Sequence, residues 1–301
     1  MFKKILITGV NGQVGHALKH AMATEATLHI ISLDRSQLDL TDTDAIRRVV
    51  QAHKPDLIIN PAAYTAVDKA ESEPELAYAI NAVAPRVLAE EAESIGASLI
   101  HFSTDYVYSG NKIDPYVETD ATQPISVYGQ SKLAGEMAVS AVGLPHLILR
   151  TSWVYGAYGN NFLKTILRLA SEREELRIVA DQMGAPTSSQ NIAQAVMDIL
   201  PQWQATTNGV YHLVNSGFTS WHGFALAIVD EYRRVQVERG WPVLKTLPIN
   251  IKAITTKEFP TLAVRPTNSI LDCTKLATDF AIQLPNWRVA LIAEMKALRL
   301  N

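Results

Sequence analysis

The sequence predicts an α/β protein built on a doubly wound parallel sheet, with a smaller and partly discontinuous second lobe. Three observations lead to this prediction. Apolar segments of strand length alternate with helical segments up to about residue 150, a pattern that favours parallel strands with right-handed crossovers. Three closely spaced glycines follow the first apolar segment. Beyond Arg150 the alternation weakens, which indicates that the chain leaves the sheet there.

Composition sets the broad class of protein. The 301 residues are 48% hydrophobic and 19% charged, which supplies ample core material for two lobes. The net charge is −3 and no basic run occurs, so we expect neither nucleic acid nor an anionic membrane as a partner. The single cysteine, Cys273, suits a reducing compartment. The apolar run at residues 5–7 is too short for a signal peptide, and we expect a cytoplasmic protein.

The first strand, Lys4 to Thr8, leads into the pattern G-x-x-G-x-x-G and then into a helix through His20. In this position the first glycine permits a tight turn, the second lets the backbone approach a pyrophosphate, and the third allows close packing of helix on strand. The spacing resembles the extended branch of the short-chain dehydrogenase/reductase superfamily. We therefore predict a Rossmann-like fold that binds NADPH or NADH, with cofactor contacts at Gly9, Asn11, Gly12, Gln13, Val14 and Gly15.

The second strand, residues 28–33, ends at Asp34 and Arg35. An acidic residue there binds the ribose hydroxyls of NAD, whereas an arginine accommodates the 2′-phosphate of NADP. Both residues are present, so the choice between NADH and NADPH stays open.

The same resemblance places Asp39 and Leu40 near the adenine. Asp39 could instead cap the helix that begins near residues 41–44, although Thr41 or Asp42 would cap it equally well.

A third strand, residues 57–59, feeds a segment rich in small residues. Small side chains would let a nicotinamide ribose lie against the backbone. This segment adds four predicted cofactor contacts: Ala62, Ala63, Tyr64 and Thr65.

The remaining segments complete the predicted topology. We expect a helix at 72–95, a strand at 98–102, a helix at 127–141 and a strand at 147–150, followed by helices at about 160–171 and 221–234 and a strand at 210–214. Residues 1–150 should form the dinucleotide-binding domain, completed by parts of 187–216. Residues 151–301 should form mainly a substrate-binding lobe.

Thr104, Tyr128 and Lys132 are the predicted catalytic residues. Tyr128 and Lys132 are four residues apart and lie on one face of a helix. A nearby ammonium favours the phenolate and lowers the pKa of a tyrosine. A solvated helical pair would explain these two residues alone. Thr104 directly follows the fourth strand, at the edge of the sheet where ligands bind, and its conjunction with the glycine turn favours catalysis. Tyr128 and Lys132 should also contact the cofactor.

Longer motifs make the resemblance specific. S-T-D-Y-V-Y-S-G, V-Y-G-Q-S-K-L-A-G-E, R-T-S-W-V-Y-G and D-Q-M-G-A-P-T are similar to the dTDP-4-dehydrorhamnose reductase family over nearly the whole chain. The resemblance implies reduction of a 4-keto sugar nucleotide by NAD(P)H. It implies that Tyr128 is the proton donor, that Lys132 binds the nicotinamide ribose and lowers the pKa of the tyrosine, and that Thr104 hydrogen-bonds the keto oxygen.

Five residues are predicted to contact the substrate besides Thr104. The resemblance gives Asp105 and Trp153 contacts to the sugar, although Trp153 could equally be an anchor between the lobes. Arg265 could pair with a substrate pyrophosphate or simply be an exposed loop arginine. Asn161 and Gln182 lie in segments rich in side chains that form hydrogen bonds, and we assign both to the substrate.

Two alternative functions remain open. Another sugar-nucleotide ketoreductase, dehydratase or epimerase would share the fold, but dehydratases of this type carry a glutamate after the aspartate, whereas Tyr106 follows Asp105 here. A non-catalytic NADP-binding subunit that resembles the regulatory subunit of methionine adenosyltransferase is the second alternative.

Oligomeric state is a separate expectation. Some members of the family dimerise through acidic residues that share a magnesium ion, but the matching positions here are Ala17 and Gln190. We predict no metal site, and a monomer or a metal-independent homodimer.

Overall fold

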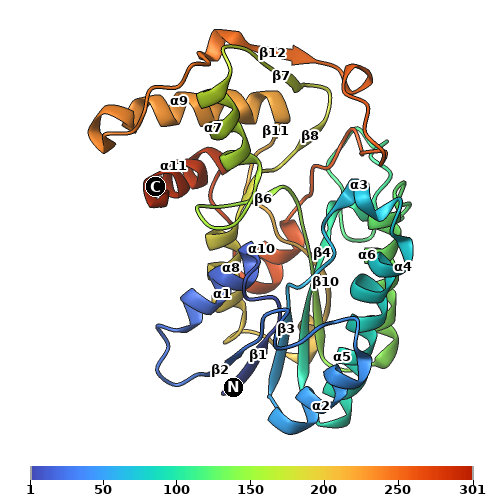
Figure 1. The fold of residues 1–301 in the computed structure, drawn as a ribbon. Coiled ribbons are helices and arrows are strands. Elements are labelled where there is room, and N and C mark those ends of the chain that lie inside the picture. Colours follow the sequence, from blue (N-terminus) through green and yellow to red (C-terminus); the bar gives the residue numbers. More distant parts are fainter. Residues whose placement is uncertain (1, 300–301) are drawn as a thin grey trace.

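The computed structural model describes residues 2–299, and a six-stranded parallel sheet forms its centre (Figure 1). The strand order is β10-β5-β4-β3-β1-β2, with bounds β1 (Lys4–Ile7), β2 (His29–Ser32), β3 (Leu57–Asn60), β4 (Ser98–Thr104), β5 (His146–Thr151) and β10 (Gly209–His212). The order reverses between β1 and β3, and a crevice forms at such a switch point. The predicted doubly wound parallel sheet is confirmed.

Helices cover both faces of the sheet. Side chains alternate along each strand, and because both sets are apolar, each face must be buried. Ile5 and Ile7 face one layer, formed by α1 (Gln13–Met22), α8 (Ser189–Ile199) and α10 (Thr274–Phe280). Leu6 faces the other layer, formed by α2 (Thr43–His53), α5 (Ala84–Ser94) and α6 (Val127–Val142). The strands are thus apolar on both faces, as a fully covered sheet requires.

The helix predicted at 72–95 is interrupted. It divides into α4 (Pro74–Tyr78), a π-helical turn (Ala79–Val83) and α5. Pro85 has no backbone N–H and cannot donate to Asn81 O, as an α-helix would require. Helix α6 packs closely here, since a Cβ added to Gly135 would lie 2.0 Å from Asn81 O.

A second lobe lies beyond the carboxyl ends of the strands (Figure 1). It contains a two-stranded sheet of β7 (Leu176–Val179) and β12 (Ile251–Ile254), and three helices, α7 (Phe162–Glu172), α9 (Trp221–Arg239) and α11 (Trp287–Ala297). Tyr155, Phe224 and Trp287 lie in its core. The strands β6 (Val154–Tyr155) and β9 (Thr187–Ser188) form a short pair, as do β8 (Met183–Gly184) and β11 (Thr219–Ser220), and α3 (Val67–Ala70) is a short helix.

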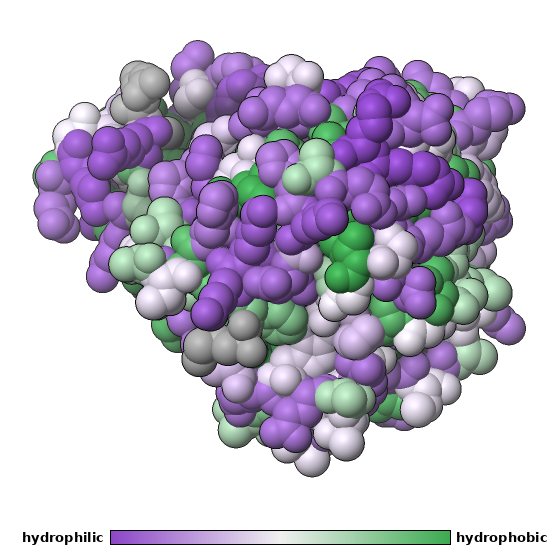
Figure 2. All heavy atoms as spheres, turned by 90° about the horizontal axis from the view of Figure 1, so that it is seen from below, coloured by the Kyte–Doolittle hydropathy of each residue, from purple (hydrophilic) through white to green (hydrophobic). Residues whose placement is uncertain are grey.

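The opposite end of the molecule presents a mainly hydrophilic surface. Figure 2 shows this end, where the apolar residues form small, separate groups. In residues 2–299, no helix combines the length and apolar character needed to cross a membrane.

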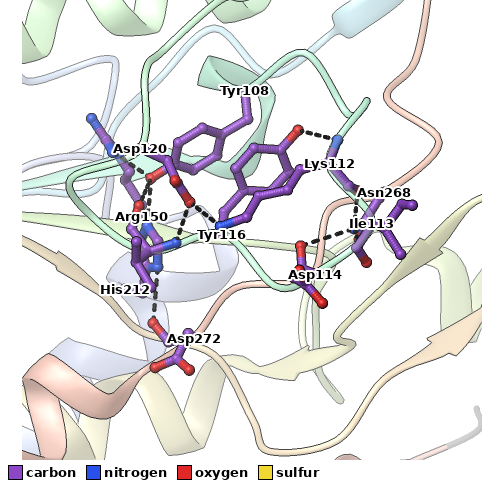
Figure 3. A network of polar contacts seen from close by, with 11 residues as sticks. Tyr108, Lys112, Ile113, Asp114, Tyr116, Asp120, Arg150, His212, Asn268 and Asp272 are labelled. Carbon is purple, nitrogen blue, oxygen red and sulfur yellow. Dashed lines mark hydrogen bonds and ion pairs between the residues drawn. The ribbon is translucent and has the colours of Figure 1, made fainter.

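A buried polar network supports the sheet next to the predicted catalytic residues. Arg150, on β5, pairs with Glu136, on α6, through Nη2 and Oε2 at 2.6 Å. Its Nη1 donates to the Tyr108 hydroxyl at 2.6 Å, and that oxygen lies 2.8 Å from His212 Nε2. Figure 3 shows Tyr108 between Arg150 and His212. His212 Nδ1 reaches Asp272 O at 2.9 Å, so the network links two strands to a C-terminal segment.

Candidate active site

A cavity of about 600 Å³ lies at the carboxyl edge of the sheet, and its lining includes residues after β1, β2 and β3. Almost every predicted cofactor residue lines it: Gly9, Asn11, Gly12, Gln13, Val14, Gly15, Arg35, Asp39, Leu40, Ala62, Ala63, Tyr64, Thr65, Tyr128 and Lys132. The structure therefore brings these residues from four separate segments of sequence to one site. Asp34 alone of the predicted set is not part of the lining.

The glycine turn between β1 and α1 is tightly packed at its first and third glycines. Gly9 has φ +57°, and a Cβ there would lie 2.8 Å from the Cβ of Ala62. A Cβ on Gly15 would lie 2.3 Å from Gly9 O, so only glycine lets α1 pack against the turn. Gly12 caps α1 without any side-chain hydrogen bond. The first N–H groups of α1 are left for an anion, which the helix dipole also favours.

Asp34 and Arg35 have different surroundings. The Asp34 carboxylate accepts hydrogen bonds from Ser36 Oγ at 2.6 Å and Asn11 Nδ2 at 3.1 Å, and these bonds, with Ser36 the largest contributor, lower its pKa. Asp34 thus joins the loop after β2 to the glycine turn, whereas Arg35 lines the cavity.

Asp39 also lines the cavity. It accepts from Thr41 N at 2.9 Å, and helix α2 is capped instead by Asp42, which accepts from Ala45 N at 2.9 Å. The cap alternative for Asp39 is therefore wrong.

Asn81, which no motif in the sequence indicates, holds the loop after β3. Its Oδ1 accepts from Tyr64 N at 2.8 Å, and its Nδ2 donates to Tyr64 O at 3.1 Å and to Ser131 Oγ at 3.0 Å. Asn81 is fully buried within the π-helical turn, and such turns are frequent at functional sites. It fixes the cofactor loop relative to the helix that carries Tyr128 and Lys132.

Thr104 and Tyr128 come from β4 and α6. Ser126 caps α6 by accepting from Gly129 N at 3.2 Å, which places Tyr128 in the first helical turn. Thr104 Oγ1 donates to Asp105 Oδ1 at 2.9 Å. Burial raises the pKa of Tyr128 to about 12, against the opposing effect of a Thr104 hydrogen bond. The phenol therefore keeps its proton at neutral pH.

Lys132 is turned towards the sheet. Its Nζ donates to Phe102 O at 2.6 Å and lies 3.3 Å from His101 Nε2. Burial lowers the pKa of the ammonium to about 8. We expected Lys132 to lower the pKa of Tyr128 towards neutrality, but in the protein without ligand this is wrong, because desolvation of the phenol dominates.

Two buried side-chain oxygens in the described chain have no hydrogen-bond partner, Thr151 Oγ1 and Asp105 Oδ2. Thr151 lines the cavity and pairs with Thr104 in the register of β4 and β5. Burial raises the pKa of Asp105 to about 6. Since buried polar atoms almost always find a partner, both oxygens are suited to a ligand. No pattern in the sequence indicates a role for Thr151.

Trp153 lies in an aromatic stack. The centroids of the Trp153 and Trp221 rings lie 3.5 Å apart, with an interplanar angle of 9°. The backbone of Trp153 has a φ of +46°. A Cβ on Gly184 would lie 2.6 Å from the Trp153 ring. Glycine at 184 is thus needed for this packing, and the stack joins the end of β5 to helix α9.

Asn161 is occupied by the protein itself. Its Oδ1 caps α7 by accepting from Lys164 N at 3.1 Å, and its Nδ2 donates to Gln13 Oε1 at 3.0 Å and Gly156 O at 2.8 Å. Both amide hydrogens are therefore used within the protein, and we propose no substrate contact for Asn161. It ties the glycine turn to the second lobe.

Gln182 and Arg265 lie in the second lobe. Gln182 is buried and donates to Thr256 Oγ1 at 3.1 Å. Arg265 pairs with Asp68 at 2.8 Å, which connects its loop to α3. In residues 2–299 no group of three or more histidine, cysteine, aspartate or glutamate side chains could hold a metal ion.

Comparisons with known proteins agree with this geometry. The family model of the RmlD substrate binding domain matches residues 3–300. The dTDP-4-dehydrorhamnose reductase of Burkholderia thailandensis is 45% identical over 95% of this chain and 96% of its own. The enzyme of the same name from Escherichia coli K12 is 43% identical over 95% and 94%. The crystal structure of the Bacillus anthracis dTDP-4-dehydrorhamnose reductase in complex with NADP has a TM-score of 0.89 and 37% identity, covering 99% of this chain and 100% of that one. The chain therefore belongs to the dTDP-4-dehydrorhamnose reductase family.

Proposed function

We propose that this protein reduces the 4-keto group of dTDP-4-dehydro-L-rhamnose to give dTDP-L-rhamnose, with NAD(P)H as the hydride donor. The observation that carries the proposal is the position of Tyr128 and Lys132 in the wall of the cavity that the glycine turn also lines. Family membership supports the choice of substrate. The dehydratase alternative lacks support because Asp105 is followed by Tyr106.

The cavity fits the proposed cofactor. Free N–H groups at the start of α1 suit a pyrophosphate, and the tight turn at Gly9 and Gly15 holds this helix end at the cavity. The unpartnered Thr151 hydroxyl, which also lines the cavity, can meet a polar group of the cofactor. A reduced nicotinamide bound there supplies the hydride.

The catalytic groups would then act on the keto oxygen. As the carbonyl carbon accepts the hydride, its π electrons move to the oxygen, and the Tyr128 phenol gives up its proton to form the alcohol. Thr104 would stabilise the developing negative charge by turning its single hydroxyl hydrogen from Asp105 Oδ1 to the keto oxygen. Lys132 holds the nicotinamide ribose, and its positive charge favours the phenolate that Tyr128 becomes. Asp105 and Trp153 would contact the sugar, and Gln182 and Arg265 the rest of the nucleotide sugar.

The lobes would divide these tasks. We infer that residues 1–150, with parts of 187–216, bind the dinucleotide, and that the rest of 151–301 binds mainly the nucleotide sugar. We also infer a cytoplasmic location, since the single cysteine suits a reducing compartment.

NAD(P)H consumption with a panel of nucleotide-linked 4-keto sugars tests the function. We expect turnover with the dTDP-linked 4-keto-6-deoxy sugar and the appearance of dTDP-rhamnose. Tight NADPH binding without turnover of any sugar in the panel would contradict the proposal and favour the regulatory-subunit alternative.

A preference for NADPH over NADH is our first prediction, since the Asp34 carboxylate already accepts from Ser36 and Asn11 while Arg35 lines the cavity. Arg35→Ala should raise KM for NADPH by about tenfold and leave KM for NADH nearly unchanged, because a charge-assisted contact to a phosphate contributes about 1.5 kcal/mol or more. Initial rates with both cofactors measure this. Arg48→Ala, on the outer face of α2, is the matched control. Equal changes in both KM values would contradict the role of Arg35.

The second prediction concerns assembly. A shared magnesium ion needs carboxylate ligands, but Ala17 is buried in the core and Gln190 offers a neutral amide. We propose a monomer or a metal-independent homodimer, whose mass in sedimentation should be the same in EDTA and in added magnesium. Dissociation in EDTA would contradict this.

A further inference from the structure

A chain of buried polar side chains runs behind the catalytic lysine. Thr8, Asn60 and His101 come from or directly follow three neighbouring strands, and none is more than 1% exposed. Thr8 Oγ1 lies 2.6 Å from Asn60 Oδ1, Asn60 Nδ2 lies 3.1 Å from His101 Nδ1, and His101 Nε2 lies 3.3 Å from Lys132 Nζ. The contacts lead without interruption from the end of β1 to the ammonium group.

Core packing alone does not explain this chain. The same face of these strands is otherwise filled by aliphatic residues, Leu6, Ile58 and Leu99, and apolar side chains would avoid the cost of burying an amide and an imidazole. Asn60 and His101 are direct partners in the register of β3 and β4. Their polar groups can be satisfied only by each other and by the groups at either end. One of those ends is a catalytic residue.

The geometry at Lys132 indicates what the chain does. An ammonium has three N–H groups. One is directed to Phe102 O at 2.6 Å and a second towards His101 Nε2. The third remains for the cavity, whose wall Lys132 forms together with Tyr128. Two contacts on the sheet side therefore fix the direction of the third N–H.

We propose that His101, held by Asn60 and Thr8, is a positioning residue for Lys132, accepting one ammonium N–H so that another points at the cofactor ribose. The proposal rests on the proposed function, because it assigns Lys132 to the ribose. His101 is fully buried and does not line the cavity, so it acts only through Lys132.

The imidazole of His101 must carry its single proton on Nδ1. If Lys132 donates to Nε2, that nitrogen carries no proton, and in a neutral ring the proton is then on Nδ1. Asn60 must then present its oxygen to Nδ1, which a half-turn of the amide about its Cβ–Cγ bond achieves, because the amide nitrogen and oxygen are nearly equal in size. Asn60 Nδ2 would then donate to Thr8 Oγ1. Burial, and then the charge of Lys132, hold the pKa of His101 well below its usual value, so the ring stays neutral and able to accept.

Two substitutions of His101 separate positioning from core packing. The end of a glutamine side chain reaches the place of Nε2, whereas asparagine reaches only the place of Nδ1. His101→Gln can therefore still accept from Lys132, but His101→Asn cannot. We expect His101→Asn to raise KM for NADPH and lower kcat, by about 10- to 100-fold in kcat/KM, and His101→Gln to stay within about threefold of the wild type.

His146→Gln is the matched control, since this histidine lies on the neighbouring strand β5 with its ring at Leu144 O. It should leave both constants unchanged. Equal losses in His101→Gln and His101→Asn, with both variants folded, would mean that His101 only fills space, and would overturn the proposal.

The tautomer of the wild-type protein gives a test that needs no turnover. Long-range ¹H–¹⁵N NMR of histidine-labelled protein at pH 6.5 should show His101 with its single proton on Nδ1. Its Nε2 resonance should shift in Lys132→Met, which removes the donor. A proton on Nε2 in the wild type would overturn the proposal even if the variants failed to fold. Failure of the proposed function can be told apart from failure of this proposal. In the first case the wild-type protein would reduce no sugar, but the tautomer of His101 and the affinity for NADPH could still be measured.

Discussion

Replacing Tyr128 by phenylalanine is expected to lower kcat by about 10²–10⁴-fold, the usual loss when a general acid is removed. The ring would keep its edge-to-face contact with Tyr106, at 5.5 Å between centroids, so the site should keep its shape. The phenol is protonated at neutral pH because burial raises its pKa to about 12, and phenylalanine has no such proton to give. Single-turnover NADPH oxidation measures the chemical step directly.

Cofactor binding provides the internal control for this substitution. NADPH affinity, followed by fluorescence, should change little in Tyr128→Phe. In Lys132→Met both affinity and rate should fall, because one ammonium holds the ribose and also favours the phenolate. Unchanged turnover in Tyr128→Phe would refute its role as proton donor. A matching loss of NADPH affinity would instead point to a collapsed site.

Replacing Arg150 by methionine should reduce the free energy of unfolding by about 3–5 kcal/mol, because it leaves the buried carboxylate of Glu136 without its counter-charge. The two side chains are only 5% and 4% exposed. Arg150 also donates to Tyr108, so the same change removes a bond from the network in Figure 3. Urea unfolding followed by circular dichroism measures the effect.

An exposed ion pair is the control for this measurement. Arg168 and Glu172 on α7 lie 3.0 Å apart with side chains 60% and 51% exposed, and Arg168→Met should cost no more than about 0.5 kcal/mol. The double variant Glu136→Gln with Arg150→Met should recover part of the loss, since the stranded charge is gone. A cost for Arg150→Met as small as that of Arg168→Met would contradict the stabilising role given to the buried pair.

Much of the fold could be predicted from the sequence because its signals are local. The alternation of strands and helices and the glycine spacing each depend on residues close in the chain, and they placed Gly9, Tyr128 and Lys132 correctly at one sheet edge. The interruption of the predicted helix at 72–95 was missed, since the apolar pattern continues through the π-helical turn and Pro85 alone marks it.

What could not be predicted depends on contacts between distant segments. Asn81 is seventeen positions from Tyr64, and no motif connects them. His101 lies in an apolar strand with no metal-ligand spacing, so it could be interpreted only as a surface or core residue. The pKa of Tyr128 was misjudged for the same reason: spacing reveals its neighbour Lys132, but burial is a property of the whole fold.

The late arrival of β10 and α8 in the chain has a consequence for biosynthesis. The sheet is complete only when residues 209–212 pair with β5. The face of the sheet that carries Ile5 and Ile7 is covered by α8 as well as by α1. While the ribosome is still adding the second lobe, the nascent first lobe therefore exposes an open strand edge and an apolar layer, the features that promote aggregation. The first 150 residues alone therefore lack one strand of the sheet and two helices of one covering layer, and the nucleotide-binding half should be stable only when the later segments are present.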